Sequence, residues 1–176
     1  LTLVLGGDLS WQGINFLDGV GGSVTINTGN TLTLGSGGIY NTANISFNIK
    51  PAIVLSADQT WHNTTGFFEL GSGTLGIDTA GHTFTLTGGG PKKFNTSVTG
   101  GGDIIVMDGT AQFYGAATTA ADSAITANSG ATLRYDLHTG SKTLAKSVTI
   151  KGGTLYTLGD SHANTLDTIT GNLTVG

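Results

Sequence analysis

Two short stretches of the chain combine a carboxylate with an indole, residue types that many proteins use to hold a sugar. Asp8 precedes Trp11 by three residues, and Asp58 precedes Trp61 by the same spacing. An exposed indole can stack on the apolar face of a sugar ring while a nearby carboxylate accepts hydroxyl protons. These four residues are the candidate ligand-facing site. The competing interpretation is architectural, with the aspartate capping a turn and the tryptophan covering or filling a corner.

The two stretches repeat each other at an interval of fifty residues. The segment IVLSADQTWHN begins at Ile53 and echoes LVLGGDLSWQG, which begins at Leu3. His62 corresponds to Gln12 in the other copy, so the imidazole is not part of the repeated pattern. Because the pattern recurs, the architectural interpretation is favoured: the aspartate forms a turn, and the tryptophan is a structural staple at a bulge of the solenoid. Ligand binding is the second choice.

The composition argues against several other classes of function. Only 10% of the residues are charged, the net charge is −4 and cysteine is absent. Seven scattered cations provide no basic groove for nucleic acid, and no apolar run is long enough for direct membrane insertion. Without cysteine the chain has neither disulfides nor thiolate metal ligands, and its four histidines are too dispersed to indicate a metal site.

The acidic residues do not indicate a hydrolase. Asp103 and Asp108 flank one short strand and would lie roughly 16 Å apart along it, whereas a carboxylate pair for glycoside hydrolysis needs about 5–10 Å. The Asp-Asp doublet, Gly-His-Gly and Arg-x-Lys elements of polygalacturonase-like enzymes are not found in the sequence. We therefore expect no enzyme, no catalytic residue and no cofactor.

A repeated pair of short strands accounts for most of the sequence. The chain holds 30 glycines and 30 threonines, a composition that favours strands and turns over helices. The clearest unit is VTINTGNTLTL, from Val24 to Leu34. Copies begin at positions 24, 45, 75, 98, 125, 148 and 169, with steps of 21 to 30 residues that average about 24.

A period of this length without helical patterning predicts one coil of a parallel β-helix per unit. We expect a single all-β domain over residues 1–176, a β-solenoid of about seven coils of ~21–30 residues. Valine, isoleucine, leucine and phenylalanine would fill the interior, and threonine would point outward. An antiparallel sandwich or barrel is the runner-up, because closely spaced short strands suit those folds too.

Asparagine or aspartate occurs just after the first strand of many units. These residues tolerate left-handed backbone geometry, and their side chains can bond to the equivalent side chain one coil away. We expect them to form a turn ladder that consists of Asn27, Asn48, Asp78, Asn128 and Asn172.

The repeats resemble those of a known family. The phrases IVLSADQTW, GTLGIDTAGHTFTLTGGG, GGTLYTL and GNLTVG are similar to the autotransporter-associated β-strand repeats of large secreted passenger proteins of Gram-negative bacteria. The resemblance covers most of the chain. It implies a right-handed parallel β-helix that is secreted or displayed on the bacterial cell surface, and a scaffold role without catalytic residues.

Both ends of the sequence read as interrupted repeats, LTLVL at Leu1 and GNLTVG at Gly176. Uncapped coil edges pair readily with further strands, so we expect more of the same repeat array, or end-to-end self-association, to cover them. The expected function is an extracellular structural or adhesive solenoid that forms a stalk, fibre or surface scaffold, with a glycan or a cell surface as candidate target. The alternative is a carbohydrate-binding or polysaccharide-degrading β-helix.

Overall fold

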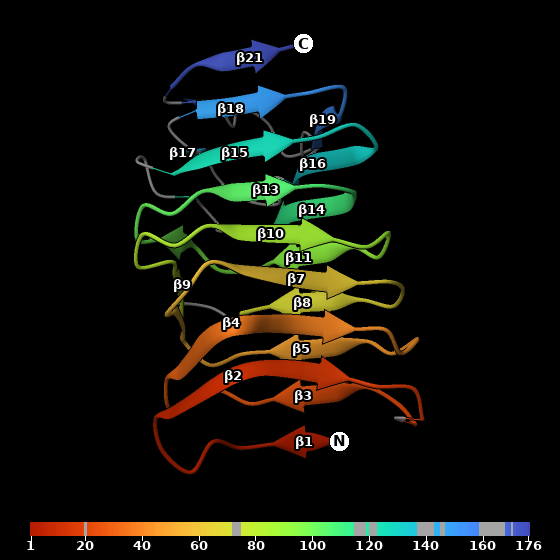
Figure 1. Cartoon of the computed structure of the whole chain (residues 1–176), viewed down its shortest axis with the longest axis vertical. Helices are drawn as coiled ribbons and strands as arrows, with labels where there is room; N and C mark the ends of the chain where they lie inside the picture. Colours follow the sequence, from red (N-terminus) through yellow and green to blue (C-terminus); the bar gives the residue numbers. More distant parts are fainter. Residues whose placement is uncertain are drawn as a thin grey trace.

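The computed structural model of the chain is a rod of stacked parallel strands (Figure 1). It describes residues 1–19, 21–71, 75–114, 119, 123–136, 143–144, 147–158, 168–169 and 171–176. Every strand pair within these residues is parallel, and none of them lies in a helix. The expected parallel β-solenoid is confirmed, and the antiparallel sandwich or barrel is wrong.

Each turn of the coil carries up to three strands, which form three faces. The first face is an eight-stranded sheet of β1 (Thr2–Leu3), β3 (Val24–Ile26), β5 (Phe47–Ile49), β8 (Phe68–Leu70), β11 (Lys92–Phe94), β14 (Gly109–Tyr114), β16 (Ala131–Asp136) and β19 (Thr154–Leu158). The second face consists of β2 (Leu9–Phe16), β4 (Leu32–Asn41), β7 (Gln59–Asn63), β10 (Phe84–Thr87), β13 (Ile104–Val106), β15 (Ala124–Ala127), β18 (Ser147–Ile150) and β21 (Leu173–Val175). The third face has shorter strands, β6 (Ile53–Leu55), β9 (Ile77–Asp78), β12 (Val98–Thr99), β17 (Thr143–Leu144) and β20 (Thr168–Ile169).

The long strands β2 and β4 join the second and third faces near the N-terminal end. The beginning of β4 pairs with β6, and its end pairs with β7. The register between β2 and β4 shifts after Trp11, so that Gly13 lies opposite Gly38 and segment 35–37 bulges beside Gln12. The bend at this bulge lets one strand serve two faces.

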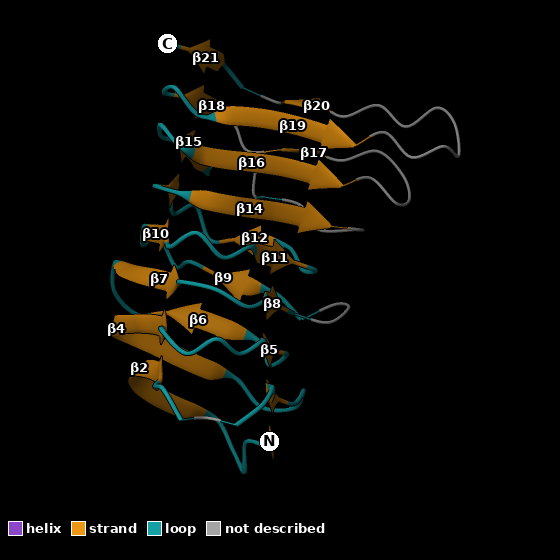
Figure 2. Ribbon diagram, turned by 90° about the vertical axis from the view of Figure 1, so that its right-hand side faces the viewer, coloured by secondary structure: helices purple, strands orange, loops and turns teal. Residues whose placement is uncertain are grey.

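The coil is right-handed and rises steadily from the N-terminus to the C-terminus. In Figure 1 the nearer strands, such as β4 and β7, run to the right, and the more distant strands, such as β5 and β8, run to the left. Figure 2 shows the same stack from the side, with β14, β16 and β19 lying one above another. Each turn contributes one strand to the eight-stranded first face, so the number of turns is close to the expected seven.

The strand register differs from the expected repeat alignment. Steps between paired residues run from 19, between Lys92 and Ala111, to 25, between Val148 and Leu173. The expected unit starts lie on different faces: Val24 is on the first, Val98 on the third and Val148 on the second. The expected coil of 30 residues is wrong, because that alignment compared strands of different faces.

A column of aromatic rings fills much of the interior. Neighbouring ring centroids are 4.0–6.2 Å apart in this core column, which comprises Phe16, Phe47, Phe68, Trp61, Phe84, Phe94, Phe113 and Tyr135. Valine, isoleucine and leucine at alternate strand positions complete the core. The expected alternation is confirmed in β3, where Val24 and Ile26 are buried while Thr25 faces outward. In the part of the chain that the structure describes, no helix is long and apolar enough to cross a bilayer.

Candidate functional site

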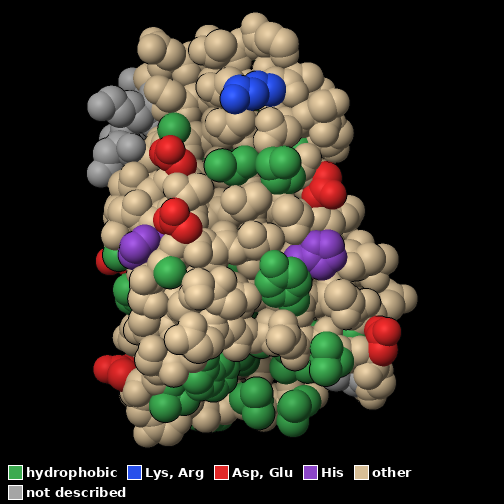
Figure 3. Space-filling model, in the orientation of Figure 1, with side chains coloured by type: hydrophobic (Ala, Val, Ile, Leu, Met, Phe, Trp, Pro, Cys, Tyr) green, Lys and Arg blue, Asp and Glu red, His purple; other side chains and the backbone are tan. Residues whose placement is uncertain are grey.

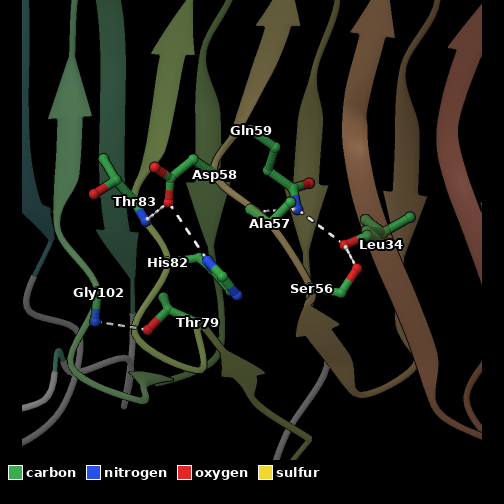
Figure 4. Close-up of polar contacts among 9 residues, drawn as sticks. All are labelled: Leu34, Ser56, Ala57, Asp58, Gln59, Thr79, His82, Thr83 and Gly102. Atoms are coloured by element: carbon green, nitrogen blue, oxygen red, sulfur yellow. Dashed lines mark hydrogen bonds and ion pairs between the residues drawn. The ribbon is translucent and has the colours of Figure 1, made fainter.

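Aspartates at the corners of the solenoid tie consecutive coils together. Asp58 directly precedes β7, and its Oδ1 accepts the backbone N–H of Thr83 at 2.9 Å (Figure 4). Asp8 precedes β2 and accepts the N–H of Thr31 at 2.7 Å in the same way. In both cases the donor is the residue at the equivalent position of the next coil, so each carboxylate caps a corner. The turn-capping interpretation describes what the two aspartates do.

A third aspartate makes the same contact and was missed by sequence reasoning. Asp103 precedes β13, and its Oδ1 accepts the N–H of Ala124 at 3.1 Å. A signal was available: Asp103 and Asp8 both follow two glycines and precede an apolar residue. The two aspartates nevertheless lie in different columns. Leu9, after Asp8, leads in register to Leu32 and to Ile53 of the third face, whereas Ile104, after Asp103, is in register with Phe84 of the second.

Trp61 lies inside the core and offers no surface to a ligand. Its side chain is 0% exposed, between the rings of Phe68 and Phe84. The indole Nε1 donates to Gln59 Oε1 at 2.7 Å, and the Gln59 amide donates in turn to the Leu34 carbonyl. An exposed sugar platform at Trp61 is therefore wrong. Its alternating position in β7 points inward, as a core residue does.

The two Asp–Trp pairs do not stack on one another. Trp11 is half-buried against the core and pairs in register with Leu34, which pairs with Leu55. The residue two coils beyond Trp11 is therefore Leu55 and not Trp61. The two similar segments, fifty residues apart, therefore form corners of two different faces. Asp8, Trp11, Asp58 and Trp61 do not meet in one site.

The five residues of the expected turn ladder are not neighbours. Asn48 lies within β5 between Thr25 and Glu69, and its Nδ2 donates to Glu69 Oε2 at 3.1 Å. Asp78 lies within β9 and pairs with Thr99. Asn27, Asn128 and Asn172 lie next to β3, β15 and β21, on two different faces. The ladder was wrong for the same reason as the repeat alignment, because it placed residues of three faces in one column.

The asparagines that do stack are Asn41 and Asn63, at the ends of β4 and β7. They are opposite each other in register and both are buried. Asn41 Nδ2 donates to Asn63 Oδ1 at 2.8 Å, and Asn63 Nδ2 donates to the carbonyls of Gly66 and Pro91. We call this stacked pair the asparagine rung, and it stabilises the corner between the second and first faces. The recurrence of Asn-Thr after Tyr40 and after His62 was the signal in the sequence.

We expect Asn63→Ala to lower the free energy of unfolding by about 2 kcal/mol, because it removes the buried hydrogen bonds of the Asn63 side chain to Asn41, Gly66 and Pro91 and leaves a cavity in their place. Urea denaturation followed by circular dichroism measures the loss. Asn44→Ala, at an exposed asparagine of the preceding turn, is the matched control. An equal, small effect of both substitutions would contradict a structural role for the rung.

Tyr40 and His62 form a stacked pair on the outside of the second face. Their ring centroids are 5.9 Å apart with an interplanar angle of 23°. Each imidazole nitrogen lies 2.9 Å from a threonine hydroxyl, Nδ1 from Thr87 and Nε2 from Thr64. Two hydrogen bonds fix the orientation of the ring, so the pair is a rigid element of this surface.

The charged side chains of the first face pair with one another. Lys93 Nζ lies 3.6 Å from Glu69 Oε1 and 3.8 Å from the centroid of the Tyr114 ring. Arg134 lies 3.3 Å from Asp136, which also accepts a hydrogen bond from Gln112. Contacts of this kind add modest stability along the outer surface of the solenoid. They neutralise the charges locally and do not gather cations into a groove.

Lys92 is a buried cation in the interior. It occupies the inward position that Phe68 has one coil earlier, and its Nζ donates to the carbonyl of Gly88. Burial lowers the pKa of Lys92 from its ordinary value of 10.5 to about 8, and the nearby Asp108 carboxylate opposes part of this decrease.

No group of three metal-ligating side chains occurs among the described residues. Comparisons of the chain with protein-family models, with curated proteins and with solved structures find no match. A function therefore has to be argued from the surfaces and edges of the solenoid itself.

Proposed function

We propose that this chain is an extracellular structural or adhesive β-solenoid, which forms a stalk, fibre or surface scaffold by end-to-end self-association. The observation that carries the proposal is the continuous ladder of parallel strands along the rod. The backbone ladder of the second face runs from β2 to β21 without a change of direction, and both end strands have an unpaired edge among the described residues. Such edges add further parallel strands readily.

Apolar side chains accompany these edges. Val4 lies exposed beside β1, and Val175 of β21 is 74% exposed at the opposite end. Figure 3 shows apolar side chains gathered at the N-terminal end of the face that it displays. Another coil stacked on either end would bury them and extend the core, in the way that repeats bury one another in solenoids. The resemblance of the repeats to those of secreted passenger proteins supports the extracellular location.

We expect Val175→Lys to abolish self-association. Val175 stands in register with the core residue Ile150, so a stacked coil would bury the new ammonium group, at a cost of several kcal/mol. Sedimentation velocity over a range of concentrations measures the assembly. Met107→Lys, an equal change of charge on an exposed side position, is the control and should assemble like the wild type. A wild type that stays monomeric at every concentration, or a Val175→Lys variant that assembles equally, would refute the proposal.

The second candidate function, a carbohydrate-binding or polysaccharide-degrading solenoid, loses its original site because Trp61 is buried. A carbohydrate site elsewhere on the second face is a separate question.

A further inference from the structure

A hollow with a hydroxyl-rich lining lies on the second face between β4, β7 and β10. Its volume is about 290 Å³, near the lower end of the range for ligand pockets. We call it the hydroxyl hollow, and it is lined by Ser36, Asp58, Gln59, Thr60, Thr83 and Thr85. Four hydroxyl groups can each donate and accept hydrogen bonds, a lining that suits a ligand rich in hydroxyls.

The bulge of β4 keeps this hollow open. Gly38 lies next to Thr60 with φ of +61°, and a Cβ atom there would come within 2.0 Å of the Thr60 carbonyl oxygen. No larger residue fits without displacing the backbone. β4 therefore presents no side chain beside Thr60, and Ser36 stands at the rim on the bulge.

A rigid ring platform adjoins the hollow. His62 is two residues beyond Thr60 in β7 and therefore projects on the same outer side of the sheet. The stacked partner of His62, Tyr40, keeps 40% of its surface exposed. An oriented, half-exposed aromatic side chain next to hydroxyl groups can cover the apolar face of a sugar ring.

A fixed carboxylate stands at the other end. The Asp58 side chain is 77% exposed, and its Oδ1 is held by the Thr83 N–H and lies 3.5 Å from His82 Nδ1 (Figure 4). The four-residue span from Asp58 to His62 measures about 13 Å along the strand, which suits an oligosaccharide better than a single sugar. The lining contains no lysine or arginine, and Asp58 would repel an anionic ligand.

We propose that the hydroxyl hollow and the Tyr40–His62 pair form a binding site for a neutral oligosaccharide. The carboxylate accepts hydrogen bonds from sugar hydroxyls, the threonine and serine hydroxyls contact the middle of the ligand, and Tyr40 stacks on a terminal ring. The site lies on the side of the rod, away from both ends. It is therefore independent of end-to-end association.

The test is a titration of the monomeric Val175→Lys variant, followed by amide chemical shifts. The probes are neutral trisaccharides of glucose, mannose and N-acetylglucosamine, with anionic trigalacturonate for comparison. We expect at least one neutral trisaccharide to bind and to shift the amides of Thr60, Thr83 and Thr85. If Val175→Lys still assembles, the titration is made on the wild type below its assembly concentration. Oligosaccharide binding is then tested even if the proposal of end-to-end association fails.

Two substitutions in this background locate the site. Tyr40→Ala removes the platform, and Asp58→Asn removes the charge while keeping an oxygen for the Thr83 N–H. Each should weaken binding by about tenfold or more. Tyr156→Ala, at an exposed tyrosine of the first face, should leave binding unchanged. The proposal is overturned if none of the three neutral trisaccharides binds, if trigalacturonate binds more tightly, or if the Tyr40 and Asp58 variants, checked for native amide dispersion, bind as the parent does.

Discussion

Trp61→Ala should lower the free energy of unfolding by about 3–5 kcal/mol, the largest single loss that we expect from a substitution in this chain. The indole stands in the middle of the core column, 5.8 Å from the Phe68 ring and 4.9 Å from the Phe84 ring by their centroids. Its removal leaves a cavity where rings from two faces meet. It also leaves Gln59 Oε1 without its donor in a buried site.

Urea denaturation followed by far-ultraviolet circular dichroism measures this loss, because the signal does not depend on the tryptophan. Phe67→Ala is the control: Phe67 is the exposed phenylalanine next to the buried Phe68, and we expect its loss to cost less than about 1 kcal/mol. A loss at Trp61 no larger than the loss at Phe67 would show that the indole is not a core residue.

The second large effect concerns Lys92 and depends on pH. Its pKa of about 8 in the folded chain is below the ordinary value of 10.5, so the unfolded chain binds the proton more tightly. Between pH 8 and 10.5 the unfolded state therefore holds more protons, and the contribution of this group to stability rises with pH. The full difference corresponds to about 3 kcal/mol.

Lys92→Met removes the buried charge while keeping much of the side-chain volume. We expect the variant to be more stable than the wild type at pH 7, and we expect this advantage to shrink by about 2–3 kcal/mol on going to pH 10. Lys151→Met, at an exposed lysine, corrects for the change in net charge. Denaturation curves of the three proteins at both pH values provide the comparison, and a constant difference between the wild type and Lys92→Met would contradict the burial of the cation.

The alternating residues of the sequence were enough to predict the class of fold. Val-Thr-Ile triplets place two side chains in the core and one outside, and the close spacing of such triplets without helical patterning leaves a parallel coil as the natural arrangement. The register could not be predicted in the same way. The triplet Val24–Ile26 lies on the first face and the identical triplet Val148–Ile150 lies on the second. Strands of all three faces alternate inward and outward side chains in the same way, so the pattern does not tell one face from another.

The same uncertainty about strand register limited the prediction of the candidate site. The capping role of Asp58 was predictable from its place at a turn, but the fate of Trp61 depended on which side of β7 it occupies, and a shift of one residue reverses that side. Polar residues in the interior were harder still. Asn63 is buried through hydrogen bonds to Asn41 and Pro91 of the neighbouring coils, which become its neighbours only when the coil has formed. Lys92 bonds to Gly88 of its own turn, and its inward position follows from its register with Phe68 of the preceding coil.

Fibre diffraction from concentrated, aligned protein tests end-to-end stacking most directly. If chains stack head to tail and continue the ladder, their strands lie across the fibre axis, and the strand spacing of about 4.8 Å appears as a reflection along that axis. The Val175→Lys variant should produce no such fibres. Fibres whose 4.8 Å reflection lies at right angles to the axis, which would mean that the rods associate side by side, would contradict end-to-end assembly, as would a solution that forms no fibres at all.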